Sequence, residues 1–146
     1  MNLIEKVESA VNAIGLKFIY FDLLRANNQL NITEIPCVVC IRNPNTQLIN
    51  AQGNYCEQSD FLLIFCDKMQ AGKHSNFQLT SQEVEKIIEG MKNKAVEFIR
   101  HVQTGHELMF LTSTRAQKKY EFLDLNVAGY GLDCTIRERV GVCNKI

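Results

Sequence analysis

The chain has 146 residues, 46% of them hydrophobic, and its 16 Lys and Arg balance its 16 Asp and Glu to a formal net charge of zero. A chain of this size buries about two-thirds of its unfolded surface in one domain with a substantial core. Without net charge it lacks the electrostatic field that holds a nucleic-acid backbone or an anionic membrane, which argues against a dedicated DNA-binding or membrane-surface protein.

The first residues, MNLIEKVESAV, lack the basic segment and the continuous apolar segment of a secretory signal. The longest fully apolar run is the six residues FLLIFC. That run is far shorter than the roughly 20 residues that a membrane-spanning helix requires. We therefore expect a soluble protein that is made in the cytoplasm and does not enter a membrane.

Two amphipathic helices are predicted from apolar residues at helical spacing. The first begins at the N-terminus, where Asn2 and Glu5 are placed as a capping box. The second follows the capping-box pair of Thr80 and Glu83 and covers residues 81–102. It has one continuous apolar stripe, and its other face carries alternating charges that are typical of a solvated surface.

Six further segments have the composition of strands. Residues 60–67, DFLLIFCD, are apolar on both faces, which predicts a central strand. Residues 129–139 alternate apolar and polar side chains, so we expect one wet face and, if this strand is terminal in the sheet, an unpaired edge. The other predicted strands cover residues 18–24, 36–42, 106–114 and 118–125. The simplest assembly is a single α+β domain over residues 1–146, with a mostly antiparallel sheet flanked by the two helices.

Two long polar connections separate the predicted elements. The first connection covers residues 43–59, and part of it is expected to form an extra edge strand. The second covers residues 68–80 and contains no recognisable element. Connections of this length in a small domain are usually functional or mobile, so both are candidates for partner contacts. The interface candidates are Lys68, Lys73, His74, Asn76, Arg115, Lys118 and Lys119. The three basic residues from position 115 onward are expected at a hairpin tip between two strands.

The stretch IPCVVCIR contains a Cys-x-x-Cys sequence. On a strand, residues three apart point to opposite faces, so Cys37 and Cys40 would lie about 10 Å apart, beyond the roughly 7 Å limit for a disulfide. A redox pair needs its first thiolate at a helix N-terminus, whereas Pro36 and the valines favour extended chain. We therefore interpret both cysteines as core residues of a strand.

No metal or catalytic site is predicted from the remaining residues. The other cysteines are isolated from one another, and we expect all six to be buried free thiols in a reducing compartment. His101 and His106 flank the end of the second helix, where a capping or surface role is favoured over catalysis. The carboxylates are scattered, and neither a glycine-rich phosphate loop nor a nucleophile elbow occurs. We expect no enzyme activity and no cofactor.

The order of elements resembles that of tail terminator and neck proteins of tailed bacteriophages. The resemblance spans nearly the whole chain: an N-terminal amphipathic helix, a strand led by IPCVVCI, the central FLLIFCD, a long loop, the capped helix TSQEVEKIIEGMKNKAVEFIRHV, and three C-terminal strands ending in GLDCTIRERVGVC. It implies a virion protein without catalytic residues. Such a protein forms a ring, a hexamer or a dodecamer, at the head–tail neck or the tail end, and joins a portal or adaptor to tail proteins.

The resemblance also implies how the ring is contacted. By position, residues 43–59 and 68–80 match the protruding loops of these phage proteins. The resemblance also implies that phage DNA passes close to the ring without sequence-specific binding. We hypothesise that the edge of the last strand and the 68–80 loop form part of the subunit contact.

Two other readings stay open. One is a small cytoplasmic metal-binding domain, and the other is a cytoplasmic adaptor that shares the fold without closing a ring. A zinc site would require several Cys and His residues that are far apart in sequence to converge in the fold. The candidates for it are Cys37, Cys40, Cys56, Cys66, His74, His101 and His106.

Overall fold

The computed structural model describes residues 2–20, 36–68, 81–110, 115–122, 127–140 and 144–145, and these ranges contain two helices and seven strands. The helices are α1 (Leu3–Ala13) and α3 (Ser81–Thr104). The strands are β1 (Lys17–Tyr20), β2 (Cys37–Ala51), β3 (Asn54–Lys68), β4 (Leu108–Phe110), β5 (Arg115–Phe122), β6 (Val127–Glu138) and β7 (Asn144–Lys145).

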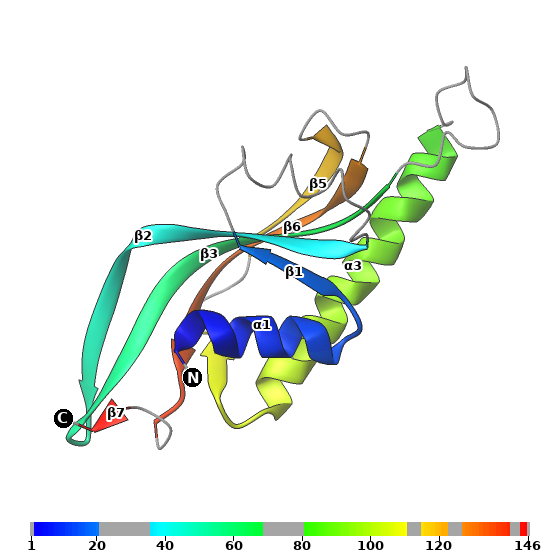
Figure 1. Ribbon diagram of the computed structural model, residues 1–146. Coiled ribbons are helices and arrows are strands. Elements are labelled where there is room, and N and C mark those ends of the chain that lie inside the picture. Colours follow the sequence, from blue (N-terminus) through cyan, green and yellow to red (C-terminus); the bar gives the residue numbers. More distant parts are fainter. Residues whose placement is uncertain are drawn as a thin grey trace.

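The strands form one mixed sheet in the order β1-β2-β3-β6-β4, with β5 also on β6 and β7 also on β3 (Figure 1). The β1–β2 pair is parallel, and every other described pair is antiparallel. The predicted α+β class, a mostly antiparallel sheet with two helices, is confirmed. The parallel pair requires a crossover connection, and the residues that connect β1 to β2 lie outside the described ranges.

The helix α1 begins as its sequence predicts. The Asn2 side chain accepts a hydrogen bond from the Glu5 backbone N–H at 2.9 Å, and the Glu5 carboxylate accepts one from the Asn2 N–H at 3.4 Å. This reciprocal capping box satisfies two N–H groups that the helix itself leaves unpaired. The second helix ends at Thr104, two residues later than expected. Its predicted cap, Thr80, lies outside the described residues.

Both helices pack on one face of the sheet. The main core joins the apolar stripe of α3 to alternate residues of β3, and the rings of Phe65 and Phe98 meet edge to face with centroids 5.8 Å apart. The other residues of β3, such as Ile64 and Cys66, form a second cluster that includes no residue of α1 or α3. The prediction that residues 60–67 form a central strand, apolar on both faces, is therefore confirmed.

The strands β2 and β3 form a long hairpin that extends away from the helices, with β7 near its tip (Figure 1). Gln52 and Gly53 at the tip both have positive φ, 54° and 83°. Two such residues make a type I′ turn, whose twist matches that of the flanking strands. The Gly53 N–H also donates to the Asn50 side chain at 3.1 Å. Residues 43–59 thus form the outer half of a hairpin, so the extra edge strand expected within them is confirmed and the long polar loop is not.

The C-terminal strand is placed differently from the prediction. β6 pairs with β3 along one side and with β4 and β5 along the other. It is an interior strand, and the expectation of an unpaired edge there is wrong. Its exposed polar residues, such as Asp133, lie on the sheet face opposite the helices. The alternation of apolar and polar side chains therefore indicates a solvent-exposed face of the sheet and not an unpaired edge.

Candidate functional site

The outer edge of the β2–β3 hairpin has no strand partner in the described part of the chain. β1 pairs with β2 only from Cys37 to Cys40, so the outer edge of β2 is uncovered beyond that point. A register shift between Arg42 and Thr46 interrupts the ladder, and Pro44 within it lacks an N–H. The edge available for pairing therefore comprises residues 46–51, which we call the hairpin edge.

The hairpin edge is uncharged and carries an exposed apolar side chain. Its sequence, TQLINA, contains no ionisable residue. Leu48 is 71% exposed, more than any other large hydrophobic side chain in the described ranges. Edge strands of monomeric proteins are usually protected by charged side chains, lysine above all. An uncharged edge with an exposed leucine is typical of a strand that another chain covers.

Buried charges fix the outer half of the hairpin to the rest of the fold. Lys6 of α1 and Glu138 at the end of β6 form an ion pair, with only 7% and 2% of these residues exposed. The second oxygen of Glu138 accepts a hydrogen bond from the Glu57 backbone N–H of β3 at 3.0 Å. On the same strand the Glu57 carboxylate pairs with Arg42, and Arg42 also donates to Ser59. These contacts hold the hairpin in a fixed direction relative to α1.

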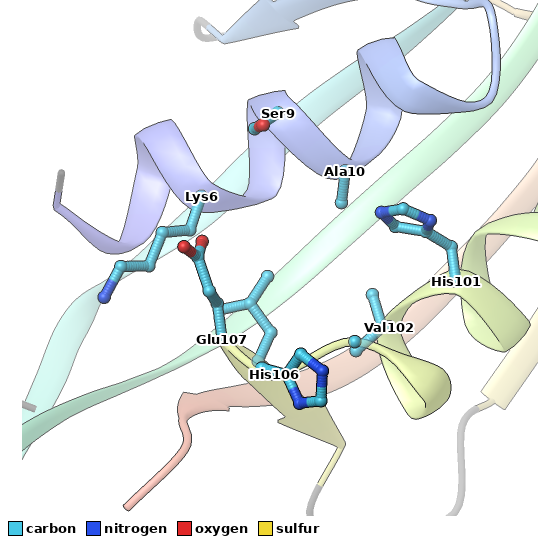
Figure 2. Close-up of a pocket in the computed structure, with 9 residues that line it drawn as sticks. Lys6, Ser9, Ala10, His101, Val102, His106 and Glu107 are labelled. Carbon is cyan, nitrogen blue, oxygen red and sulfur yellow. The ribbon is translucent and has the colours of Figure 1, made fainter. Parts of the chain in front are cut away.

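A small cavity lies between α1 and the C-terminal end of α3 (Figure 2). Its volume is about 130 Å³. Figure 2 shows His101 pointing from α3 toward Ala10 of α1, while the Lys6 amine points away from the cavity to meet Glu138. His106 and Glu107 are exposed at its rim. Within the described ranges, no three His, Cys, Asp or Glu residues are placed to hold a metal ion.

The Cys-x-x-Cys cysteines lie on opposite faces of the sheet, as predicted. Cys40 belongs to the core beneath the helices and Cys37 to the second cluster, and both are fully buried free thiols. Burial raises the pKa of Cys40 well above its ordinary value and that of Cys134 to about 12. At neutral pH burial therefore favours the protonated thiol over the thiolate at both residues.

Two findings change the interpretation of the other cysteines. Cys56 is disulfide-bonded, so the prediction that all six are free thiols is wrong. The Sγ atoms of Cys37 and Cys66 lie 3.6 Å apart. Their side-chain contact, together with burial, raises the pKa of Cys66. Both cysteines lie in segments that were predicted to be strands of a mostly antiparallel sheet. A contact between them follows once these two strands are paired as neighbours.

Four of the seven predicted interface residues lie within the described ranges. Lys68 is exposed at the end of β3, whereas Lys73, His74 and Asn76 lie outside the described residues. The basic residues expected at a hairpin tip instead lie within β5. Arg115 begins that strand, Lys118 pairs with Glu85 of α3 at 3.2 Å, and Lys119 donates to Gln117 at 3.0 Å. The reason is that β4 and β5 do not form a hairpin with each other, because both run antiparallel to β6 and therefore in the same direction.

Sequence reasoning missed the buried ion pair, and it predicted an edge strand within residues 43–59 without its hairpin partner. Lys6 and Glu138 are 132 positions apart, and no local signal links them.

No protein-family model and no curated protein matches the chain. Among the described helices, neither is both long and apolar enough to cross a membrane. The arrangement of the sheet edges is therefore the strongest guide to function.

Proposed function

We propose that the chain is a structural subunit of a tailed-bacteriophage virion, of the tail terminator or neck type, and that it forms a ring with copies of itself. The observation that carries this proposal is the hairpin edge: an uncharged, projecting strand edge whose backbone groups have no described partner. In the virion the ring joins a portal or adaptor to tail proteins. The subunit is not an enzyme, and phage DNA passes it without sequence-specific contacts.

Strand addition is the contact that such an edge makes best. Main-chain N–H and C=O groups of an incoming strand satisfy those of the edge, and side chains on alternate positions give specificity. Leu48 then becomes buried against the neighbour, which removes its exposed apolar surface from water. The contacts of Glu57 with Glu138 and Arg42 support this role, because a hairpin that is held in place before assembly reaches the neighbour without a large loss of conformational entropy.

A ring needs a second, different surface on each subunit to receive the hairpin edge. The outer side of β5 is the edge we assign to this role, since β5 pairs only with β6 among the described strands. It is exposed from Arg115 to Lys118 and carries positive charge. An uncharged edge approaches a basic one without like-charge repulsion, whereas two β5 edges repel each other. Pairing of the hairpin edge with β5 of the next copy is therefore favoured over pairing of two β5 edges.

The experiment compares two substitutions of exposed apolar residues. Leu48→Asp places a charge on the hairpin edge, and Val140→Asp places the same charge on a residue that is 45% exposed outside the hairpin. Sedimentation velocity over a concentration series measures self-association, and circular dichroism checks the fold. We expect Leu48→Asp to weaken association at least about tenfold and Val140→Asp to leave it unchanged.

Hydrogen exchange gives a second readout of the same contact. The amides of residues 46–51 are expected to exchange more slowly in the assembled wild type than in Leu48→Asp, because strand addition protects them. Equal weakening by both substitutions, or protection that does not change with assembly, would argue that the hairpin edge is not the subunit contact. A wild type that stays monomeric throughout the series would instead support the adaptor reading.

A further inference from the structure

Two free cysteines face each other at the end of the β2–β3 hairpin that lies away from its tip. Cys37 is the first residue of β2, and it is the register partner of Cys66 on β3. Their Sγ atoms are 3.6 Å apart, and both residues are fully buried in the cluster on the sheet face away from the helices. Neither takes part in the contacts of Glu57 with Glu138 and Arg42.

The backbone geometry at this pair already suits a disulfide. Directly opposed residues of an antiparallel pair have Cα atoms about 4.5–5.5 Å apart, within the roughly 4.4–6.8 Å that a disulfide requires. Both side chains lie on the same face, so rotation about their side-chain bonds brings the sulfur atoms to bonding distance. Cys40 and Cys134 lack this geometry, because their register partners on β3 are Leu63 and Phe61.

We propose that Cys37 and Cys66 are a site of oxidative modification, at which the two thiols form a cross-strand disulfide. This disulfide would link β2 to β3 at the end of the hairpin opposite its tip. This inference does not depend on the proposed function. The bond would enclose the whole hairpin, from its first residue to nearly its last, in one covalent loop. It would therefore lock the element that presents the hairpin edge.

The oxidant we name is a small-molecule disulfide of the glutathione class. The thiolate of one cysteine attacks a sulfur of the small disulfide and releases one small thiol, which leaves a mixed disulfide on the protein. The thiolate of the other cysteine attacks the protein sulfur of that mixed disulfide and releases the second small thiol. Two electrons pass from the cysteines to the small disulfide, and the two cysteine protons end on the released thiols.

Burial makes this site slow to react until the sheet edge opens. The strand that pairs with β2 at Cys37 is β1, which the structure describes over four residues, Lys17–Tyr20. Fraying of a parallel edge strand is a local event that costs less than global unfolding. Reaction through this opening distinguishes the pair from an exposed thiol, which would react without delay. We therefore expect oxidation to follow the rate of local opening.

The test equilibrates the purified full chain with oxidised glutathione, or with reduced glutathione as a reference, and then alkylates it under denaturing conditions. Peptide mapping reports which cysteines are linked and separates this bond from the one at Cys56. We expect a Cys37–Cys66 linkage in the oxidised sample and two alkylated residues in the reference. The midpoint of thermal unfolding should rise by roughly 5–10 °C on oxidation, as expected for closing a loop of about 30 residues.

Two matched variants make the result specific. Cys37→Ala and Cys40→Ala each remove a fully buried thiol from β2, on opposite faces of the sheet. Cys40→Ala should keep the oxidation-dependent rise in the unfolding midpoint, and Cys37→Ala should lose it. Wild-type Cys37 and Cys66 that both remain alkylatable after equilibration would overturn the proposal. Linkage of either residue to Cys40 or Cys134 would overturn it as well.

Discussion

Lys6→Met is expected to lower the free energy of unfolding by about 3–5 kcal/mol. Methionine keeps most of the apolar stem of Lys6 but leaves the Glu138 carboxylate buried without its cation. An uncompensated buried charge costs far more than a lost surface contact. The matched control is Lys92→Met, which removes an exposed ion pair to Glu89 and should cost less than about 0.5 kcal/mol. Urea denaturation of both variants measures the difference.

A double variant separates the charge penalty from simple loss of contacts. Lys6→Met combined with Glu138→Leu removes both charges, so we expect it to recover part of the stability lost in Lys6→Met alone. Recovery should be incomplete, because the Glu57 N–H then loses its acceptor in a partly buried site. If Lys6→Met costs no more than Lys92→Met, the ion pair does not anchor the hairpin.

Gly129→Ala is expected to destabilise the chain by about 3 kcal/mol or more, because it forces β3 and β6 apart. A Cβ atom at Gly129 would lie 2.1 Å from the Phe65 carbonyl oxygen and 2.9 Å from the Cys66 Cα. Both are backbone atoms of the paired strand, so neither can move aside without breaking the ladder. The expected loss is measured by thermal or urea unfolding.

Gly131→Ala is the matched control, two residues along the same strand and on the same face. The nearest atom to its added Cβ is the Lys119 Cε at 3.3 Å, which belongs to a flexible side chain that can move. We expect a change within about 1 kcal/mol, since alanine also restricts the unfolded chain. Equal losses in the two variants would show that the close approach at Gly129 does not limit the sheet.

Elements with local signals were predictable from the sequence. The start of α1 follows from Asn2 and Glu5, because a capping box involves only residues three apart. The central position of β3 follows from residues 60–67, since a strand that is apolar on both faces must be covered on both. The separation of Cys37 and Cys40 onto opposite faces follows from strand geometry alone.

The outer hairpin and the sheet edges were not predictable in the same way. Residues 43–59 are polar because they project from the core, and their strand conformation comes from the backbone ladder and from the turn at Gln52 and Gly53. Clean alternation in β6 identified a wet face, but alternation carries no information about which strands lie on either side. The ion pair of Lys6 with Glu138 and the disulfide at Cys56 depend on long-range contacts that spacing does not reveal.

Native mass spectrometry of the full-length chain tests the central claim, self-assembly into a ring, most directly. Spectra are recorded over a concentration series, with a chelator as a control for bound metal. We expect one closed oligomer, a hexamer or a dodecamer, whose mass is a whole multiple of the chain mass and does not change with the chelator. A monomer at every concentration, or an open series of oligomers without a preferred size, would contradict ring assembly through the hairpin edge.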